Sequence, residues 1–220
     1  YTLAIGLYKI GLTQDSALPF IGELHHIDVG MPTSKLSKVD EKIFKVTYKD
    51  IKNIDLPFLP KNSNKYQRGR TLIIAGSEKY PGAAYLALKG AISSGAGFIS
   101  AVLPGIVAES IWQVAPEIVL KETMQSNQSG NASLFSALKN IDLSAFDSLA
   151  VGPGIGTDND DWQKSKDYLM AFGGLLILDA DALNRISESK LGSNFFLERK
   201  FKTWITPHSK EFGRLFPNIK

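Results

Sequence analysis

Short apolar runs alternate with longer amphipathic segments along most of this chain. The runs read as buried strands, because they are rich in leucine and β-branched residues and end at glycine, proline or acidic turns. They lie near residues 71–76, 98–103, 148–152, 175–179 and 203–206. Such alternation is typical of a parallel sheet that has helices on both faces and right-handed crossovers. The pattern therefore predicts an α/β fold with a mostly parallel sheet.

The segments between these runs place apolar residues at helical spacing. The predicted helices cover residues 82–97, 107–115, 132–141 and 160–172, a further helix begins near residue 209, and one more strand is expected at 117–122. Asp160 or Asp161 lies near the start of the helix over 160–172, where a carboxylate interacts favourably with the helix dipole.

The first part of the chain has a different composition. Residues 1–32 hold two strand-like runs, 2–7 and 23–31, which we expect to be joined by a polar turn. Residues 33–65 are rich in Lys, Asp and Asn, so we predict a linker with one short helix or strand and a domain boundary inside it. The βαβ pattern then occupies residues 66–220.

Composition excludes several classes of function. The net charge is only +3 and lysines outnumber arginines 20 to 5 without clustering, so we predict no nucleic-acid partner. The absence of cysteine removes thiol chemistry and Cys-ligated metals, and it fits a cytoplasmic location. No apolar run approaches the ~20 residues of a membrane span, and no secretory signal pattern is visible.

The carboxyl ends of parallel strands share one edge of a sheet, where open α/β proteins bind their ligands. Gly76 and Gly82 flank the turn after the strand at 71–76, but their spacing matches neither the dinucleotide nor the Walker pattern, which favours an ordinary turn. The turn Gly152-Pro153-Gly154-Ile155-Gly156 is more specific. It is either a tight glycine-capped turn or a backbone that approaches a ligand phosphate or ribose.

Acidic and amide side chains follow the strand at 175–179. Asp179 and Asp181, with Asn184 one helical turn further, can contact Mg²⁺-bound phosphate or ribose hydroxyls. The alternative is that one carboxylate caps the next helix. We predict a mixture, with one capping carboxylate and one carboxylate in the site. No dedicated metal centre is predicted.

His208 stands at the last strand end, after Pro207 and before a helix for which Ser209 is the expected N-cap. A lone histidine is usually structural, as we expect for His25 and His26. The position of His208, which matches the other polar turns, favours contact with a substrate hydroxyl or ring.

The ordered motifs GPGIG, LDADALN and TPHSKEF, preceded by AGSEKYPGAAYLALKGAISSGAG, resemble the ADP/ATP-dependent NAD(P)H-hydrate dehydratases of the ribokinase-like carbohydrate-kinase group. This resemblance covers roughly residues 66–216 and implies a three-layer αβα fold, C-terminally incomplete here. Residues 1–32, with YKIGLTQD and GELHHIDVGMP, resemble the C-terminal tail of the NAD(P)H-hydrate epimerase domain of bifunctional proteins.

The resemblance implies a repair enzyme whose substrate is hydrated NADH or NADPH. ADP or ATP, with Mg²⁺, phosphorylates the ring hydroxyl, and loss of phosphate restores the reduced cofactor; the epimerase domain interconverts the hydrate stereoisomers and binds K⁺. Ala83, Gly154 and His208 match positions that contact the hydrated dinucleotide. The resemblance leaves the preferred nucleotide and hydrate open, and it leaves room for a homo-oligomer.

The family's Lys-Gly strand end and G-T-G-D turn, which carries the presumed catalytic Asp, do not occur in these 220 residues. We therefore expect the catalytic group beyond Lys220, a longer parent protein, and no turnover by this chain alone. Two alternatives stay open: a small-molecule kinase of the same fold, and a non-catalytic nucleotide-binding protein.

Overall fold

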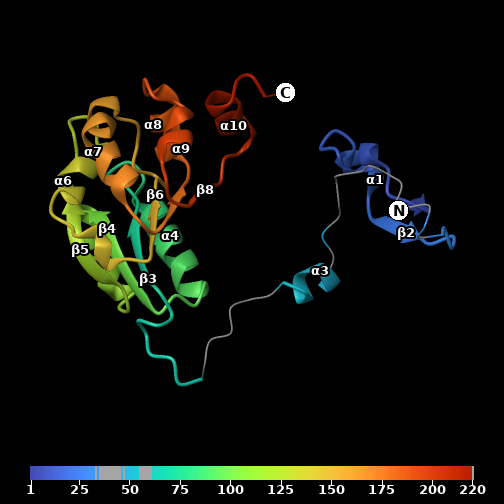
Figure 1. The fold of residues 1–220 in the computed structure, drawn as a ribbon, viewed down its shortest axis with the longest axis horizontal. Coiled ribbons are helices and arrows are strands. Elements are labelled where there is room, and N and C mark those ends of the chain that lie inside the picture. The colour runs from blue at the N-terminus through green and yellow to red at the C-terminus, as the bar shows by residue number, and fades with distance from the viewer. Residues whose placement is uncertain (33, 35–45, 47, 55–60, 220) are drawn as a thin grey trace. The chain divides into compact units, whose positions relative to one another are not determined.

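The computed structural model describes residues 1–32, 34, 46, 48–54 and 61–219 (Figure 1). The chain forms two compact units, Tyr1–Pro57 and Phe58–Lys220. The division between them falls inside the segment 33–65 that the sequence predicts to be a linker. Much of that segment lies outside the described residues.

The first unit contains a small parallel sheet. Strand β1 (Thr2–Ile5) pairs in parallel with β2 (Leu24–Ile27), so both expected strands are confirmed. The polar turn expected between them is wrong. The connection holds the 3₁₀ helix η1 (Ile10–Thr13) and helix α1 (Leu18–Ile21), because parallel neighbours need a crossover connection. Helix α3 (Tyr48–Lys52) also belongs to this unit.

The second unit is built on a six-stranded sheet. Its strands are β3 (Arg70–Ile74), β4 (Phe98–Pro104), β5 (Val119–Met124), β6 (Ser148–Val151), β7 (Leu175–Leu178) and β8 (Thr203–Ile205). The order across the sheet is β5-β4-β3-β6-β7-β8, and every neighbouring pair is parallel. The predicted parallel sheet and its strands are therefore confirmed.

Helices alternate with these strands (Figure 1). They are α4 (Pro81–Ser93), α5 (Gly105–Ala108), η2 (Ile111–Gln113), α6 (Leu134–Leu138), η3 (Leu143–Ala145), α7 (Asn159–Ala171), α8 (Asp181–Glu188), α9 (Asn194–Glu198) and α10 (Ser209–Leu215). None of the helices in the described part of the chain is long and apolar enough to cross a membrane.

One predicted helix is broken in the structure. The segment 107–115 was expected to form a single helix, but it contains only the end of α5 and the separate turn η2. At the break, the Ser110 hydroxyl donates to the carbonyl oxygen of Val107 at 3.4 Å. Such a side-chain bond competes with the helical hydrogen bonds of the backbone.

The sheet lies between two helical layers, each with its own apolar core. One core joins alternate residues of the central strands, such as Leu149, to α6, α7, α8, α9 and α10. The other joins the opposite faces of β3 and β4 to α4 and α5. Because both faces of the central strands are covered, these strands read as continuous apolar runs. The three-layer αβα arrangement expected from the sequence is confirmed.

We expect Leu149→Ala to lower the free energy of unfolding by about 2–5 kcal/mol, because the fully buried Leu149 side chain leaves a cavity at the centre of β6. Leu197→Ala is the matched control, since Leu197 is 83% exposed and its truncation should change stability by less than about 0.5 kcal/mol. Urea denaturation measures both values. Equal losses in the two variants would contradict this assignment of the core.

Candidate functional site

The polar turns of the second unit share one edge of the sheet. In the strand register, Ile74, Val151, Leu178 and Ile205 form one row across β3, β6, β7 and β8. All strands run in the same direction, so the turns that follow this row open at the same edge, as predicted. Chain order reverses between β3 and β6, which makes their junction the topological switch point where open α/β sheets bind ligands.

Two predicted site residues meet at this switch point. Ala83 lies in the first turn of α4, and Gly154 lies in the turn after β6. A Cβ atom at position 154 would lie 2.6 Å from the Cβ of Ala83 and 2.9 Å from the Cβ of Tyr80. The small size of both residues therefore lets the two loops approach each other. Since Gly154 also has a φ of +69°, the protein itself requires glycine here.

Hydrogen bonds fix most of the glycine turn, which we define as residues 152–156. The amide of Gly76 donates to the carbonyl of Pro153 at 2.7 Å, and the amide of Ile155 donates to the carbonyl of Gly152 at 3.3 Å. Among the described residues, the N–H of Gly154 has no hydrogen-bond acceptor. In a trans peptide the N–H points away from the preceding carbonyl, so the Gly76–Pro153 bond also sets the direction of this donor. The turn thus presents one free backbone donor at the switch point.

A buried ion pair lies behind the glycine turn. Nη1 of Arg185, in α8, is 2.7 Å from Oδ2 of Asp161, in α7. Nε of Arg185 donates to the carbonyl of Gly156 at 2.7 Å, and Nη2 donates to the carbonyls of Ala132 and Ile155 at 2.8 and 3.2 Å. Burial lowers the pKa of Arg185, and the charge and hydrogen bond of Asp161 oppose that effect. The guanidinium therefore ties α7, α8 and the glycine turn together.

Asp161 also holds the start of a neighbouring helix. Its Oδ1 accepts from the Ser133 hydroxyl at 2.6 Å and from the Phe135 amide at 3.2 Å, and its Oδ2 accepts from the Leu134 amide at 2.8 Å. The sequence interpretation gave Asp161 only a role in the dipole of its own helix. That interpretation is incomplete, because Asp158 is the N-cap of α7 and Asp161 turns inward. No periodicity in the sequence marks either Asp161 or Arg185 as buried.

A loop between β5 and α6 lies beside the glycine turn. The Asn131 side-chain amide donates to the carbonyl of Thr157 at 2.8 Å, and Nδ2 of Asn127 donates to Oδ2 of Asp158 at 2.7 Å. Burial raises the pKa of Asp158, but hydrogen bonds from the Asp161 amide and Asn127 outweigh it, and the net pKa is lowered. These loop residues were missed by the sequence interpretation, because isolated asparagines are ordinary in loops.

The acidic turn after β7 differs from the prediction. The N-cap of α8 is Ala180, which has no side-chain capping bond, so the expectation of a capping carboxylate is wrong. Asp179 Oδ1 instead accepts from the Ala180 amide at 2.8 Å. Asp181 accepts from the amide of Gly156 at 2.8 Å and from Nδ2 of Asn184 at 3.2 Å. Asp181 and Asn184 are thus brought together, beside the end of the glycine turn.

Asn184 extends this contact to α10, because its Oδ1 accepts from Arg214 at 2.6 Å. Within the described ranges, no three histidine, aspartate or glutamate side chains gather closely enough to hold a metal ion. The side chains of Asp179, Asp181 and Asn184 at this edge all make hydrogen bonds within the protein.

His208 is the N-cap of α10, and the expectation that Ser209 has this role is wrong. Its Nδ1 accepts from the Lys210 amide at 3.1 Å, and Glu211 Oε2 accepts from the His208 amide at 3.0 Å, which completes a capping box. The His208 side chain is 61% exposed, so it does not fill the core. Because Nδ1 accepts, the proton is on Nε2, which lies 3.3 Å from Glu211 Oε1.

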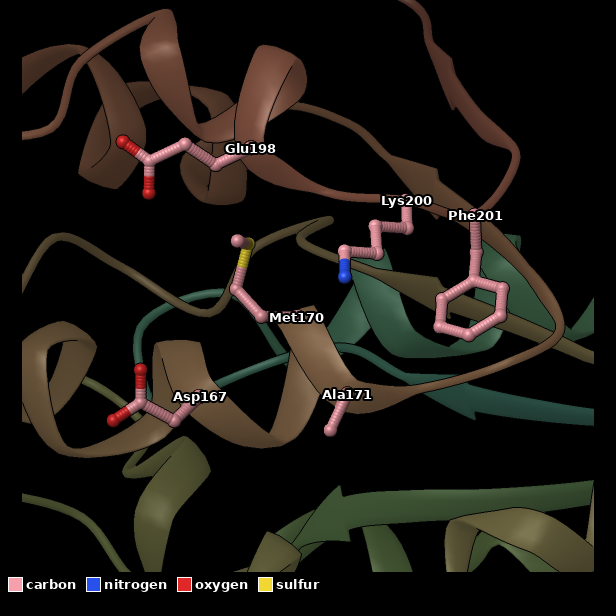
Figure 2. A pocket seen from close by; sticks show the side chains of 6 residues that line it. All are labelled: Asp167, Met170, Ala171, Glu198, Lys200 and Phe201. Carbon is pink, nitrogen blue, oxygen red and sulfur yellow. The ribbon is translucent and has the colours of Figure 1, made fainter.

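A hollow of about 360 Å³ lies elsewhere on the second unit (Figure 2). It is lined by Asp167, Met170, Ala171, Glu198, Lys200 and Phe201. These residues flank the amino-terminal ends of β7 and β8, which is the opposite edge of the sheet from the glycine turn. The hollow is therefore separate from the candidate site.

Comparison with known proteins identifies relatives of the chain. Residues 71–220 match a family model described as NAD(P)H-hydrate dehydratase. A protein named bifunctional NAD(P)H-hydrate repair enzyme Nnr from Synechocystis sp. is 32% identical over 99% of this chain and 41% of its own length. The protein of the same name from Gloeobacter violaceus is 33% identical over 99% of this chain and 42% of its own length. The chain therefore spans about two fifths of these curated relatives.

Solved structures show the same fold. An ADP/ATP-dependent NAD(P)H-hydrate dehydratase from Bacillus subtilis, co-crystallised with ATP and Mg²⁺, has a TM-score of 0.57 and 28% identity. The match covers 74% of this chain and 52% of that one. A ribokinase-like superfamily protein from Enterococcus faecalis has a TM-score of 0.57 and 26% identity over 72% of this chain and 51% of its own. The ribokinase-like fold expected from the sequence is thus confirmed.

We expect Gly154→Ala to lower the free energy of unfolding by at least about 1 kcal/mol, because the new Cβ meets Ala83 and the left-handed backbone strains alanine. Gly82→Ala, in the first turn of α4, is the matched control, since no atom outside the neighbouring residues and its own helix backbone lies within 4 Å of its new Cβ. Its stability should be unchanged or higher by up to about 1 kcal/mol. Thermal melting compares the two, and an unchanged Gly154→Ala protein would contradict the observed turn.

We expect His208→Ala to lower stability by about 0.5–2 kcal/mol, because the N-terminal amides of α10 lose their acceptor. His208→Asn should retain most of the stability, since asparagine is a good N-cap. Denaturant titration distinguishes the two substitutions. Wild-type stability in His208→Ala would show that the cap is unimportant.

Proposed function

Because the chain belongs to the NAD(P)H-hydrate dehydratase family, we propose that the open edge of its sheet binds hydrated NADH or NADPH for ADP- or ATP-dependent dehydration. The observation that carries this proposal is the meeting of Ala83 and Gly154 at the switch point. These are two of the three residues that match hydrate-contacting positions of the family. The free amide of Gly154 gives the same place a donor for a phosphate or ribose oxygen.

The third residue, His208, follows β8 on the same edge. Neighbouring strands are ~4.8 Å apart, so the ends of β3 and β8 are separated by three spacings, roughly 15 Å. An extended dinucleotide can contact both ends. His208 then donates from Nε2 to the ring hydroxyl of the hydrate, while the glycine turn binds the polar backbone of the ligand.

When bound, the nucleotide would supply a phosphoryl group to the ring hydroxyl. Loss of that group as phosphate, together with a proton from the neighbouring ring carbon, would restore the reduced ring. The residues of this chain bind and orient the hydrate. Mg²⁺ fits this site as a companion of the nucleotide phosphates, because Mg²⁺ usually takes only one or two protein carboxylates and keeps phosphate and water ligands. Asp179 and Asp181 are the candidates for those carboxylates, and Asn184 for a nucleotide contact.

We assign residues 1–32 to the end of an epimerase-like domain, 33–65 to a linker and 66–220 to the dehydratase domain. Support comes from the bifunctional relatives, because their similarity to this chain extends over the first unit as well as the second. The exposed apolar residues of β1, Leu3 at 58% and Ile5 at 61%, also fit a strand taken from a larger sheet. The K⁺ of the epimerase, the cytoplasmic location and a homo-oligomer remain predictions.

We expect the chain to bind hydrated NADH, and His208→Asn to weaken that binding by about 1 kcal/mol, or roughly fivefold in Kd. The substitution keeps the cap and removes the Nε2 donor. Unhydrated NADH is the matched ligand, because it lacks the ring hydroxyl and its affinity should not change. Calorimetric titration of both proteins with both ligands provides the measurement.

Binding is the appropriate readout because the G-T-G-D motif of the family is not among these 220 residues. Failure of the wild-type chain to bind either ligand would overturn the proposed site. Equal weakening for hydrate and NADH would show that His208 does not recognise the hydroxyl.

A further inference from the structure

We propose that Arg185 is a positioning residue that fixes the glycine turn in the conformation that binds the hydrate. This proposal rests on the proposed function for its ligand. Arg185 is fully buried and lies behind the turn, so it does not touch the ligand itself. It acts through the peptide groups that it holds.

At the end of the turn, one peptide group is held through both its carbonyl oxygen and its amide. The carbonyl of Ile155 accepts from Arg185, and the amide of the same peptide group, on Gly156, donates to Asp181. The next carbonyl, that of Gly156, accepts from Arg185 Nε. The plane that carries the Gly154 amide is set by the bond from Gly76 to Pro153. The turn is therefore held at its start by Gly76 and at its end by Arg185 and Asp181.

Glycine makes this restraint necessary. Gly152, Gly154 and Gly156 all have positive φ values, of 133°, 69° and 75°. Glycine has access to a wide range of other backbone conformations, so the turn does not hold its shape by local preference alone. A buried anchor preorganises the turn, and preorganisation raises affinity by lowering the entropy lost on binding.

The guanidinium group is the feature that suits Arg185 to this role. It donates in different directions within one plane, here to Asp161 on one side and to three backbone carbonyls on the others. A lysine ammonium can pair with Asp161 but cannot reach all of these acceptors from a single point. Arg185→Lys therefore keeps the buried charge pair and releases the turn.

The experiment compares Arg185→Lys with Arg199→Lys in the 220-residue chain. Arg199 is also buried, and its hydrogen bonds also go to backbone carbonyls, those of Leu169, Phe172 and Gly174. These carbonyls lie at the amino-terminal edge of the sheet, away from the glycine turn. Each variant is titrated with hydrated NADH at a temperature where it is folded, and its amide hydrogen exchange is measured residue by residue.

For Arg185→Lys we expect faster exchange at the hydrogen-bonded amides of Ile155 and Gly156, and binding of the hydrate weakened about tenfold or more. For Arg199→Lys we expect faster exchange only near residues 169–174 and wild-type affinity. Wild-type affinity in Arg185→Lys, or an equal loss in Arg199→Lys, would overturn the proposal. If the wild-type chain fails to bind the hydrate, the proposed function fails, and unchanged exchange in the turn would separately refute the role of Arg185.

Should Arg185→Lys not fold, the double variant Asp161→Asn, Arg185→Met takes its place. It removes both buried charges together, while the introduced asparagine side chain still offers an oxygen to the amides at the start of α6. The same result is expected, with increased exchange in the turn and loss of hydrate binding. A double variant with the exchange rates and affinity of the wild type would refute the proposal.

Discussion

The buried ion pair between Asp161 and Arg185 is the interaction on which the site depends. Removing one partner of such a pair typically costs about 3–5 kcal/mol, because the other charge remains buried without compensation. In the intact pair, near-complete hydrogen bonding offsets the cost of taking both charges out of water. The carboxylate accepts four hydrogen bonds and the guanidinium donates four. The pair therefore gives specific geometry to three helices and one turn.

That geometry matters because of the sheet topology. An all-parallel sheet places every strand-to-helix turn on one edge, but it does not determine how those turns are shaped. At the switch point the loops after β3 and β6 touch, through Ala83 and Gly154. Their separation is set by small side chains on one side and by the anchored glycine turn on the other. The fold thus supplies the location of the site, and the buried polar network supplies its shape.

The sequence predicted the strands well for a physical reason. Strands such as β3 and β6 are buried on both faces, so they appear as uninterrupted apolar runs with glycine turns at their ends. Arg185 was invisible to the same reasoning, because a single arginine in a polar helix normally lies in solvent. The helix expected over 107–115 is broken near Ser110, whose hydroxyl and amide both bond to the carbonyl of Val107. A hydrophobic pattern carries no information about tertiary contacts or local side-chain hydrogen bonds, so it could not predict either feature.

The proposed function gives His208 a ligand contact in addition to its structural role as a helix cap. Capping uses Nδ1 as the acceptor, which leaves the proton on Nε2 and makes that atom a donor. The nearest acceptor for this donor is Glu211 Oε1 at 3.3 Å, a long hydrogen bond. Glu211 keeps its second bond, to the His208 amide, if a ligand oxygen takes over Nε2. In the proposed function, the cap therefore fixes the orientation of the ring before a ligand hydroxyl arrives.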